Sequence, residues 1–93
     1  MAQLLTEAEV QNLASNLSDW TVDGSKLQSQ RQFKDFLQAM EFVNKLVEPA
    51  ESAGHHPDIE ISYNKVRITL TTHDAGGLTR KDFELAKEIS QIS

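Results

Sequence analysis

The hydrophobic positions of this chain switch between a helical and a strand-like period, so the sequence predicts helices and strands in alternation. The first segment is helical. Thr6 followed by Glu9 forms a capping-box pattern. Leu5 and Val10 are placed as the accompanying hydrophobic staple, which predicts a helix over about residues 7–15. The period then changes around Asp23-Gly24, a dipeptide suited to tight turns, and a β-hairpin is predicted there.

Residues 34–54 return to helical spacing. Asp35 is the predicted N-cap and Gly54 the predicted end of this second helix. One apolar stripe is expected along it, formed by Phe36, Met40, Val43 and Val47. Pro49 cannot donate to the carbonyl four residues back, so it should kink or end the helix near Glu48, unless the last turn continues beyond it.

Residues 58–73, with the sequence DIEISYNKVRITLTTH, alternate again and predict a second hairpin. Asn tolerates the positive φ of a tight turn, so Asn64-Lys65 is the predicted two-residue loop and Tyr63 should face Val66. The apolar face of this hairpin, which should lie on the helices, then pairs Ile61 with Ile68 and Ile59 with Leu70.

The last segment, LTRKDFELAKEIS, contains a second capping box, Thr79 with Asp82, and a staple from Leu78 to Phe83. The predicted order is α-β-β-α-β-β-α. This order indicates an α+β fold, a four-stranded antiparallel sheet with three helices packed on one face. Residues 1–93 show no internal repeat, low-complexity tract or linker, so we expect a single domain.

The charge and composition narrow the classes of function. The net charge of -5 argues against direct binding to nucleic acid or to an anionic membrane. The chain has no cysteine, which excludes disulfides, thiolate metal sites and cysteine nucleophiles. The N-terminal stretch lacks the features of a secretory signal and no segment is apolar enough to span a bilayer, so we expect a cytoplasmic protein.

All three histidines, His55, His56 and His73, lie within residues 54–73. The predicted hairpin register places His56 opposite His73, with their Cβ atoms about 5 Å apart. His55 lies in the connection between helix and strand, where alternation predicts nothing. Three interpretations are open: ordinary surface histidines, a metal site with Asp58 as a carboxylate ligand, or general acid/base groups. Neighbouring histidines seldom reach one ion together, so the acid/base interpretation fits better than the metal site.

Two carboxylates near the histidines have alternative interpretations. Glu51 lies four residues before His55 and could orient that imidazole, or it could be solvated in a frayed last turn. Asp82 is most simply a helix cap, and its side chain could in addition lie beside the loop that follows His73.

The chain resembles the pterin-4a-carbinolamine dehydratase family. The residues that carry the resemblance match the family's spacing and are Glu51, His55-His56-Pro57, Tyr63, His73 and Asp82. The segments FKDFLQAMEF, YNKVRITLTTH and GLTRKDFELA are also similar to family segments, and Trp20 stands where the family usually has one. Gly54, Ile59 and Pro49 depart from the family's usual pattern without removing a catalytic group.

The resemblance implies dehydration of a 4a-hydroxytetrahydropterin to the quinonoid dihydropterin without a metal or redox cofactor. In this family the reaction recycles the pterin that an aromatic amino-acid hydroxylase has used. His55 and His73 would transfer protons, and His56 would chiefly hold the pterin while sharing in that work. Pterin contacts would come from backbone groups of Pro57 and of the stretch Thr72, His73, Asp74 and Ala75. Glu51 and Asp82 would support the histidines.

The resemblance also bears on partners. Family members form homodimers, and sometimes tetramers of stacked dimers, and the sheet edges predicted here would need to be covered or paired. Some relatives serve as dimerisation or assembly partners of other proteins, so a non-catalytic scaffold is the alternative function. The presence of all three histidines favours the enzyme.

Overall fold

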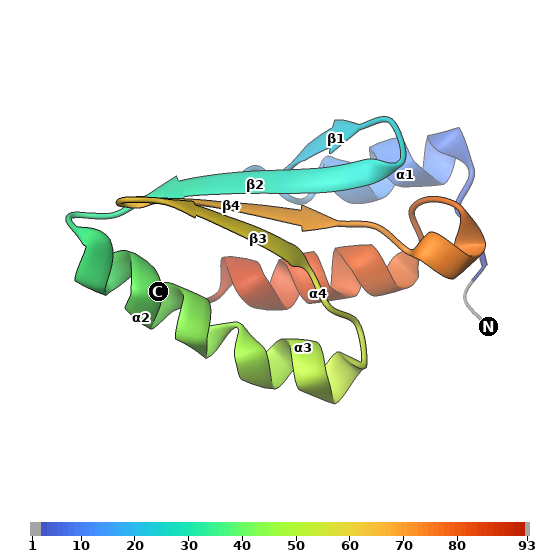
Figure 1. The fold of residues 1–93 in the computed structure, drawn as a ribbon. Helices are drawn as coiled ribbons and strands as arrows, with labels where there is room; N and C mark the ends of the chain where they lie inside the picture. The colour runs from blue at the N-terminus through green and yellow to red at the C-terminus, as the bar shows by residue number, and fades with distance from the viewer. Residues whose placement is uncertain (1–2, 93) are drawn as a thin grey trace.

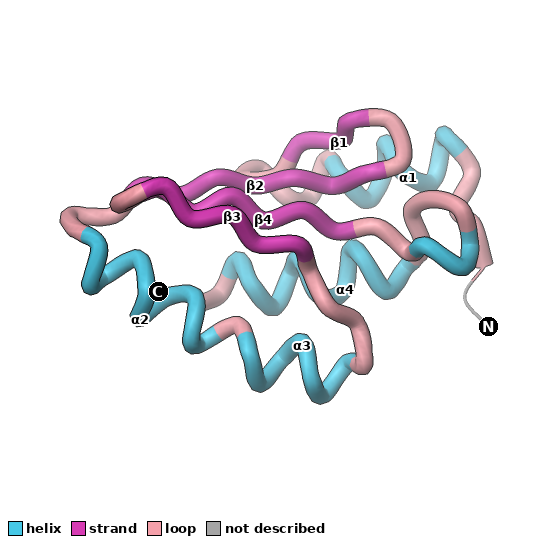
Figure 2. The backbone as a smooth tube through the Cα atoms, viewed as in Figure 1, coloured by secondary structure: helices cyan, strands magenta, loops and turns pink. Residues whose placement is uncertain are grey.

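A computed structural model describes residues 3–92 and contains two layers, a sheet and a set of helices on one of its faces (Figures 1 and 2). The predicted α+β fold is confirmed: the sheet is four-stranded and antiparallel, with strand order β1-β2-β4-β3. Within residues 3–92, no helix is long and apolar enough to cross a bilayer. In chain order the elements are α1 (Glu7–Ala14), β1 (Thr21–Asp23), β2 (Lys26–Gln32), α2 (Phe36–Lys45), α3 (Val47–Ala53), β3 (Asp58–Ser62), β4 (Lys65–Leu70), the 3-10 helix η1 (His73–Ala75) and α4 (Arg80–Ser90).

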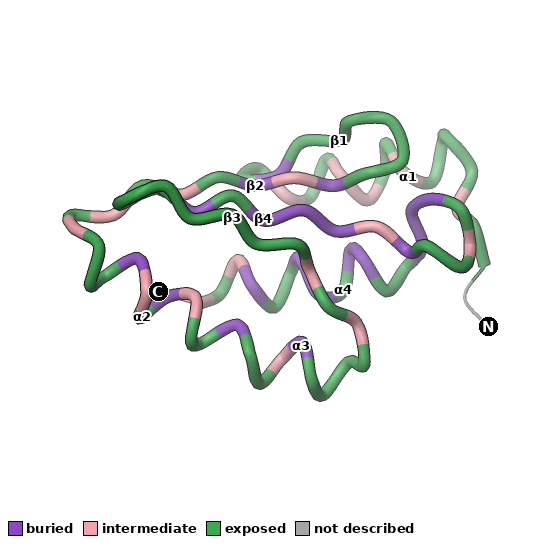
Figure 3. Tube along the Cα trace, in the orientation of Figure 1, coloured by how far each residue is buried: buried purple, intermediate pink, exposed green. Residues whose placement is uncertain are grey.

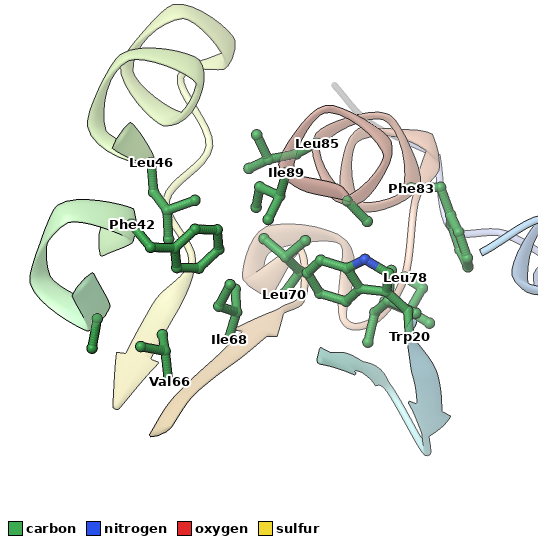
Figure 4. Packing of buried hydrophobic residues seen from close by; sticks show 13 residues of the cluster. Trp20, Phe42, Leu46, Val66, Ile68, Leu70, Leu78, Phe83, Leu85 and Ile89 are labelled. Atoms are coloured by element: carbon green, nitrogen blue, oxygen red, sulfur yellow. The ribbon is translucent and has the colours of Figure 1, made fainter. Parts of the chain in front are cut away.

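The core lies between the sheet and the helices (Figure 3). Alternate residues of β4 point inward, as the period of two predicts, and they meet the apolar faces of α2 and α4 (Figure 4). Trp20 is buried among them, and its indole Nε1 donates to Ser90 Oγ at 2.8 Å. The largest core side chains are Trp20, Leu27, Phe42, Leu46, Val66, Ile68, Leu70, Leu78, Phe83, Leu85 and Ile89.

The capping box predicted for α1 is confirmed. Glu9 Oε1 accepts from the backbone N–H of Thr6 at 2.9 Å, and the backbone N–H of Glu9 donates to Thr6 Oγ1 at 3.2 Å. The hydrogen bond from the Thr6 backbone holds the pKa of the Glu9 carboxyl below its usual range, because it favours the charged form.

The predicted second helix is two helices. α2 ends at Lys45, and α3 begins at Val47 and ends at Ala53; Gly54 is its C-cap and is left-handed at φ 61°. Pro49 lacks the N–H that would bond the carbonyl of Lys45, and the break falls beside that carbonyl rather than near Glu48. Pro49 itself lies in the first turn of α3, where backbone N–H groups have no partner within the helix.

Only the middle of the stripe predicted on this helix lies toward the core: Met40 and Val43 are half-buried, and Val43 packs against the core. Phe36 is 52% exposed and Val47 is 58% exposed, whereas Ala39, Phe42 and Leu46 are buried. The helix carries an apolar arc wider than the surface that the sheet covers. The predicted stripe lies along the border of the covered surface, and its two ends, Phe36 and Val47, are exposed. Periodicity alone cannot say which part of a wide apolar arc is covered.

The predicted register of the second hairpin is wrong. Ser62 pairs with Lys65 and Ile61 with Val66, so the loop is Tyr63-Asn64, and Tyr63 has φ 54° and is 66% exposed. Asn64 is held by tertiary contacts: its Nδ2 donates to the carbonyl of Phe33 at 2.8 Å, and its own carbonyl accepts from the N–H of Phe33 at 2.7 Å. These contacts outweigh the local turn preference of asparagine.

The shift in register changes which residues of β3 and β4 are paired, but each side chain stays on the face of the sheet that was predicted for it. Ile59 now pairs with Ile68, and the two remain on the helix-facing side of the sheet. The ladder between β3 and β4 ends at Asp58 and Thr69, so no strand pairing brings His56 opposite His73. That part of the predicted site is therefore incorrect.

Arg31 on β2 fastens the C-terminal end of α4 to the sheet. Its guanidinium donates to the carbonyls of Ile92 at 2.6 Å and Ile89 at 2.9 Å, and it stands 4.5 Å from the centre of the Phe42 ring. The last carbonyls of a helix have no partner within it, so a charged donor at this end stabilises the fold.

Replacing Arg31 with methionine should lower the free energy of unfolding by about 1.5–3 kcal/mol, because both charge-assisted hydrogen bonds are lost. Urea denaturation of purified protein would measure the change. Arg67→Met on the exposed face of β4 is the matched control and should change stability little. Equal unfolding midpoints for the two variants would contradict this role of Arg31.

Candidate functional site around His55 and Asp82

The predicted site residues come from two connections, the one before β3 and the one after β4, and from the helices next to them. Glu51 is on α3, and His55, His56 and Pro57 follow it before β3. Thr72 ends the extended backbone after β4, and η1 carries His73, Asp74 and Ala75. Asp82 lies in the first turn of α4.

The left-handed Gly54 ends α3 and turns the chain toward the histidines. Immediately after it, the backbone N–H of His55 donates to the carbonyl of Ala50 at 3.1 Å. His55 therefore leaves the helix with its backbone still hydrogen-bonded to the last turn. This contact fixes the start of the segment that carries two of the three histidines.

Asp82 is the centre of the site. It is completely buried, and its Oδ1 is 2.5 Å from Nε2 of His55, whose side chain is 11% exposed. Its Oδ2 accepts from the hydroxyl of Thr72 at 2.8 Å and from the backbone N–H of Thr79 at 2.9 Å. The predicted capping box of Thr79 and Asp82 is confirmed. The carboxylate therefore caps a helix and binds an imidazole with its other oxygen.

Thr72 also organises the loop that carries His73. Its carbonyl accepts from the N–H groups of Ala75, Gly76 and Gly77 at 3.1–3.3 Å, and its own N–H donates to the carbonyl of Gly77 at 3.1 Å. The loop is thus closed at its base, with Thr72 and Gly77 forming an isolated bridge. His73 follows directly and is exposed. The backbone polar groups of Thr72 are engaged within this loop.

Glu51 contacts a different histidine from the one that its spacing suggested. Its Oε2 is bonded to Nε2 of His56, and both side chains are about two-thirds exposed, at 68% and 64%. Of the two interpretations of Glu51, the one in which it orients His55 does not hold, because His55 is bonded to Asp82 on α4; Glu51 is largely exposed and supports His56 instead. Each of these two histidines thus has its own carboxylate partner.

The described residues do not gather ligands for a metal ion: within residues 3–92, no group of three or more His, Asp or Glu side chains is arranged to hold one. The two histidine–carboxylate pairs are separate hydrogen-bonded units. Within the same residues, every buried side-chain nitrogen and oxygen has a hydrogen-bond partner. A carboxylate-bonded imidazole is a group that can give or accept a proton, and two of the three histidines are held in this way.

The hydroxyl of Thr72 was not singled out by sequence analysis, which assigned only backbone groups to this residue. A signal for it exists. Val66, Ile68 and Leu70 alternate on the inward face, and Thr72 continues the same phase. A hydroxyl in an inward position needs a buried partner, and the capping box already placed Asp82 nearby in space.

A model of the family described as pterin 4 alpha carbinolamine dehydratase matches residues 3–92. A curated protein of Trichormus variabilis is 74% identical over 93 residues, which is 100% of both chains. One from Nostoc sp. is 73% identical with the same coverage. Both carry the provisional name pterin-4-alpha-carbinolamine dehydratase.

Two solved structures are similar in fold. A transcriptional coactivator/pterin dehydratase from Brucella melitensis has a TM-score of 0.87 at 35% identity, over 92% of this chain and 94% of that chain. A pterin dehydratase-like protein described as a RuBisCO assembly factor of the alpha-carboxysome has a TM-score of 0.56 at 23% identity, over 80% of this chain and 89% of that one. The second similarity concerns the fold alone.

Replacing Gly54 with alanine should lower the free energy of unfolding by about 1–2 kcal/mol, because φ is 61° there and a Cβ disfavours that conformation. A Cβ at this position would meet no atom within 4 Å, so the cost comes from the backbone. Gly54→Asn should lose less, since asparagine tolerates this region. Urea denaturation of both variants tests this, and an alanine variant as stable as the wild type would contradict it.

Proposed function

Because the chain belongs to the pterin-4-alpha-carbinolamine dehydratase family, we propose that it converts 4a-hydroxytetrahydropterin to quinonoid dihydropterin and water. The observation that carries the proposal is the buried Asp82–His55 pair, linked through Thr72 to the loop of His73. The reaction would recycle a pterin oxidised by an aromatic amino-acid hydroxylase.

The dehydration needs two proton transfers. The 4a-hydroxyl leaves as water after it receives a proton, the lone pair on N5 forms the new double bond, and a base removes the proton from N5. Imidazole suits both tasks, because it titrates near pH 6.5 and can give or accept a proton near neutrality. No electron is transferred to or from the protein, so the step balances with two proton-transfer groups alone.

We assign these transfers to His55 and His73. Asp82 accepts from His55 and orients its ring, while the closed loop at Thr72 positions His73. His56, held by Glu51 at the surface, would contact the pterin and share in the proton transfer. Backbone groups of Pro57, Asp74 and Ala75 are proposed to bind the ring, because they flank the histidines in the same two connections.

A non-catalytic assembly role is the second candidate function. It is favoured by the Brucella relative, which is described both as a coactivator and as a dehydratase. A scaffold alone would have no need for a buried imidazole–carboxylate pair beside a second histidine. A folded protein that binds a partner but does not accelerate dehydration would support the scaffold over the enzyme.

We further propose that the protein forms a homodimer or a tetramer. The exposed side of α2 and α3 carries large apolar side chains, Phe36, Leu37 and Val47, each more than half exposed, and we name it the apolar flank. The edge strand β3 also exposes Ile59 and Ile61, at 37% each. Burying such surfaces in a second copy would stabilise a domain whose core is limited by its length.

His56→Ala and His73→Ala should each keep the fold, because both side chains are exposed, and should each slow dehydration about 10²- to 10⁴-fold. The assay follows the absorbance of the quinonoid product formed from freshly generated 4a-hydroxytetrahydropterin. The double variant should lose less than the product of the two single losses, since the groups act on one substrate. Lys65→Ala, exposed at the far end of β4, is the control. Near-wild-type turnover in either single variant would count against this site.

Val47→Lys should weaken self-association, because it places a charge in the apolar flank. Sedimentation velocity over a range of concentrations would show the wild type as an oligomer and the variant shifted toward the monomer. Asn12→Lys, at an exposed position of α1 away from the apolar flank, is the matched charge insertion and should leave the distribution unchanged. A monomeric wild type would contradict the oligomer, and an unchanged Val47→Lys variant would contradict the assignment of the apolar flank.

A further inference from the structure

The hydrogen bonds around Asp82 have a fixed direction. Oδ2 accepts from the backbone N–H of Thr79, and it accepts the hydroxyl proton of Thr72 at 2.8 Å. The Thr72 hydroxyl has one proton, and it donates that proton to Asp82. In the 2.8 Å contact between Thr72 Oγ1 and Thr79 Oγ1, the hydroxyl of Thr79 must therefore be the donor. The chain of donors therefore runs from Thr79 through Thr72 to the carboxylate.

This direction has a consequence for His55. Oδ2 is held by donors, so Asp82 serves as an acceptor on that side and its Oδ1 faces His55 Nε2 at 2.5 Å. With Asp82 as the ionised carboxylate, Oδ1 can only accept, so a neutral imidazole, which carries one N–H, has that hydrogen on Nε2. The lone pair of the ring is then on Nδ1. A histidine side chain that is 11% exposed, beside a fully buried carboxylate, has little freedom to exchange the two nitrogens by rotation.

We propose that Thr72 is a positioning residue: its hydroxyl holds Asp82 so that His55 is kept as the Nε2–H tautomer, and Nδ1 exchanges the proton with the substrate. The second clause rests on the proposed dehydratase function. The first clause concerns the free protein and stands without it.

Thr72 is suited to a positioning role because it is connected to both His55 and His73. Its backbone closes the loop that begins with His73, and its hydroxyl reaches the carboxylate that holds His55. A helix cap alone does not require it, since the capping box is complete with Thr79 and Asp82. The Thr72 side chain is thus an addition to the cap, bonded to the carboxylate that holds His55.

The tautomer can be read directly in the free protein. With ¹⁵N-labelled histidine, long-range proton–nitrogen correlation spectra distinguish the protonated from the unprotonated ring nitrogen, and single-histidine substitutions assign the three rings. At a pH where the ring is neutral, His55 should show a protonated Nε2 and an unprotonated Nδ1. A protonated Nδ1 in the wild type would overturn the proposal.

Thr72→Val removes the hydroxyl and keeps the shape, so Asp82 Oδ2 is left with the Thr79 N–H alone. A carboxylate that is less well satisfied holds its charge and its orientation less firmly, and His55 should become a mixture of tautomers. Thr72→Ser should restore the wild-type spectrum, because it returns the donor. Thr71→Val is the matched control: the Thr71 hydroxyl donates to the carbonyl of Ser25 at 2.7 Å, away from Asp82. A Thr72→Val spectrum equal to that of the wild type would overturn the proposal.

The rate of dehydration provides the second readout. Groups that orient a functional histidine in metal sites change activity by about 10- to 100-fold, and a loss of that size in kcat is expected for Thr72→Val and not for Thr72→Ser. If the wild type shows no dehydration, the proposed function fails while the spectra still decide the tautomer. If the wild type is active and Thr72→Val keeps its full rate, the positioning role fails and the function stands.

Asp82→Asn provides an independent test in case the Thr72→Val variant does not fold. Asparagine can still accept from Thr72 and Thr79 through its carbonyl oxygen, and it then presents its NH₂ group to His55 Nε2. The folded variant should therefore switch His55 to the Nδ1–H tautomer. An Nε2–H ring in folded Asp82→Asn would overturn the proposed direction of the hydrogen bonds.

Discussion

The buried carboxylate of Asp82 is the interaction on which the site depends. It joins three segments that are distant in sequence: the connection after α3, the end of β4 and the first turn of α4. A charge taken out of water is costly unless its hydrogen-bonding capacity is filled. Here an imidazole, a hydroxyl and a backbone N–H fill it. The requirement to satisfy one acid therefore determines where His55 lies and how the neighbouring chain must run.

The two histidine–carboxylate pairs differ in the medium around them. The pair of His55 and Asp82 is shielded from water, whereas His56 and Glu51 lie at the surface. Water and salt weaken an exposed pair, so Glu51 fixes its histidine less firmly than Asp82 does. This difference supports the proposed roles of these two rings, proton transfer at His55 and chiefly pterin contact at His56.

Local rules predicted what depends on neighbours along the chain. Both capping boxes, the first hairpin, the stop at Gly54 and the inward phase of β4 follow from spacing and turn chemistry. The predictions were wrong where contacts with segments distant in the sequence determine the structure. Backbone contacts with Phe33 moved the turn at Asn64, and the coverage of the sheet determined which flank of α2 is buried. The partner of His55 also came from α4, far along the chain, rather than from the preceding turn.

Because α3 is a separate helix that packs against α4, the site is expected to stay intact when the edge of the sheet unfolds locally. α3 packs against α4, and α4 also carries Asp82, so the backbone that leads to His55 and the carboxylate that binds it belong to one helical pair. β3, which follows His55, is an exposed edge strand and is among the elements expected to open most easily. Fraying of β3 would leave the bond between His55 and Asp82 in place. The site can thus tolerate fluctuation at the sheet edge, including the rearrangement that docking of another chain on β3 would require.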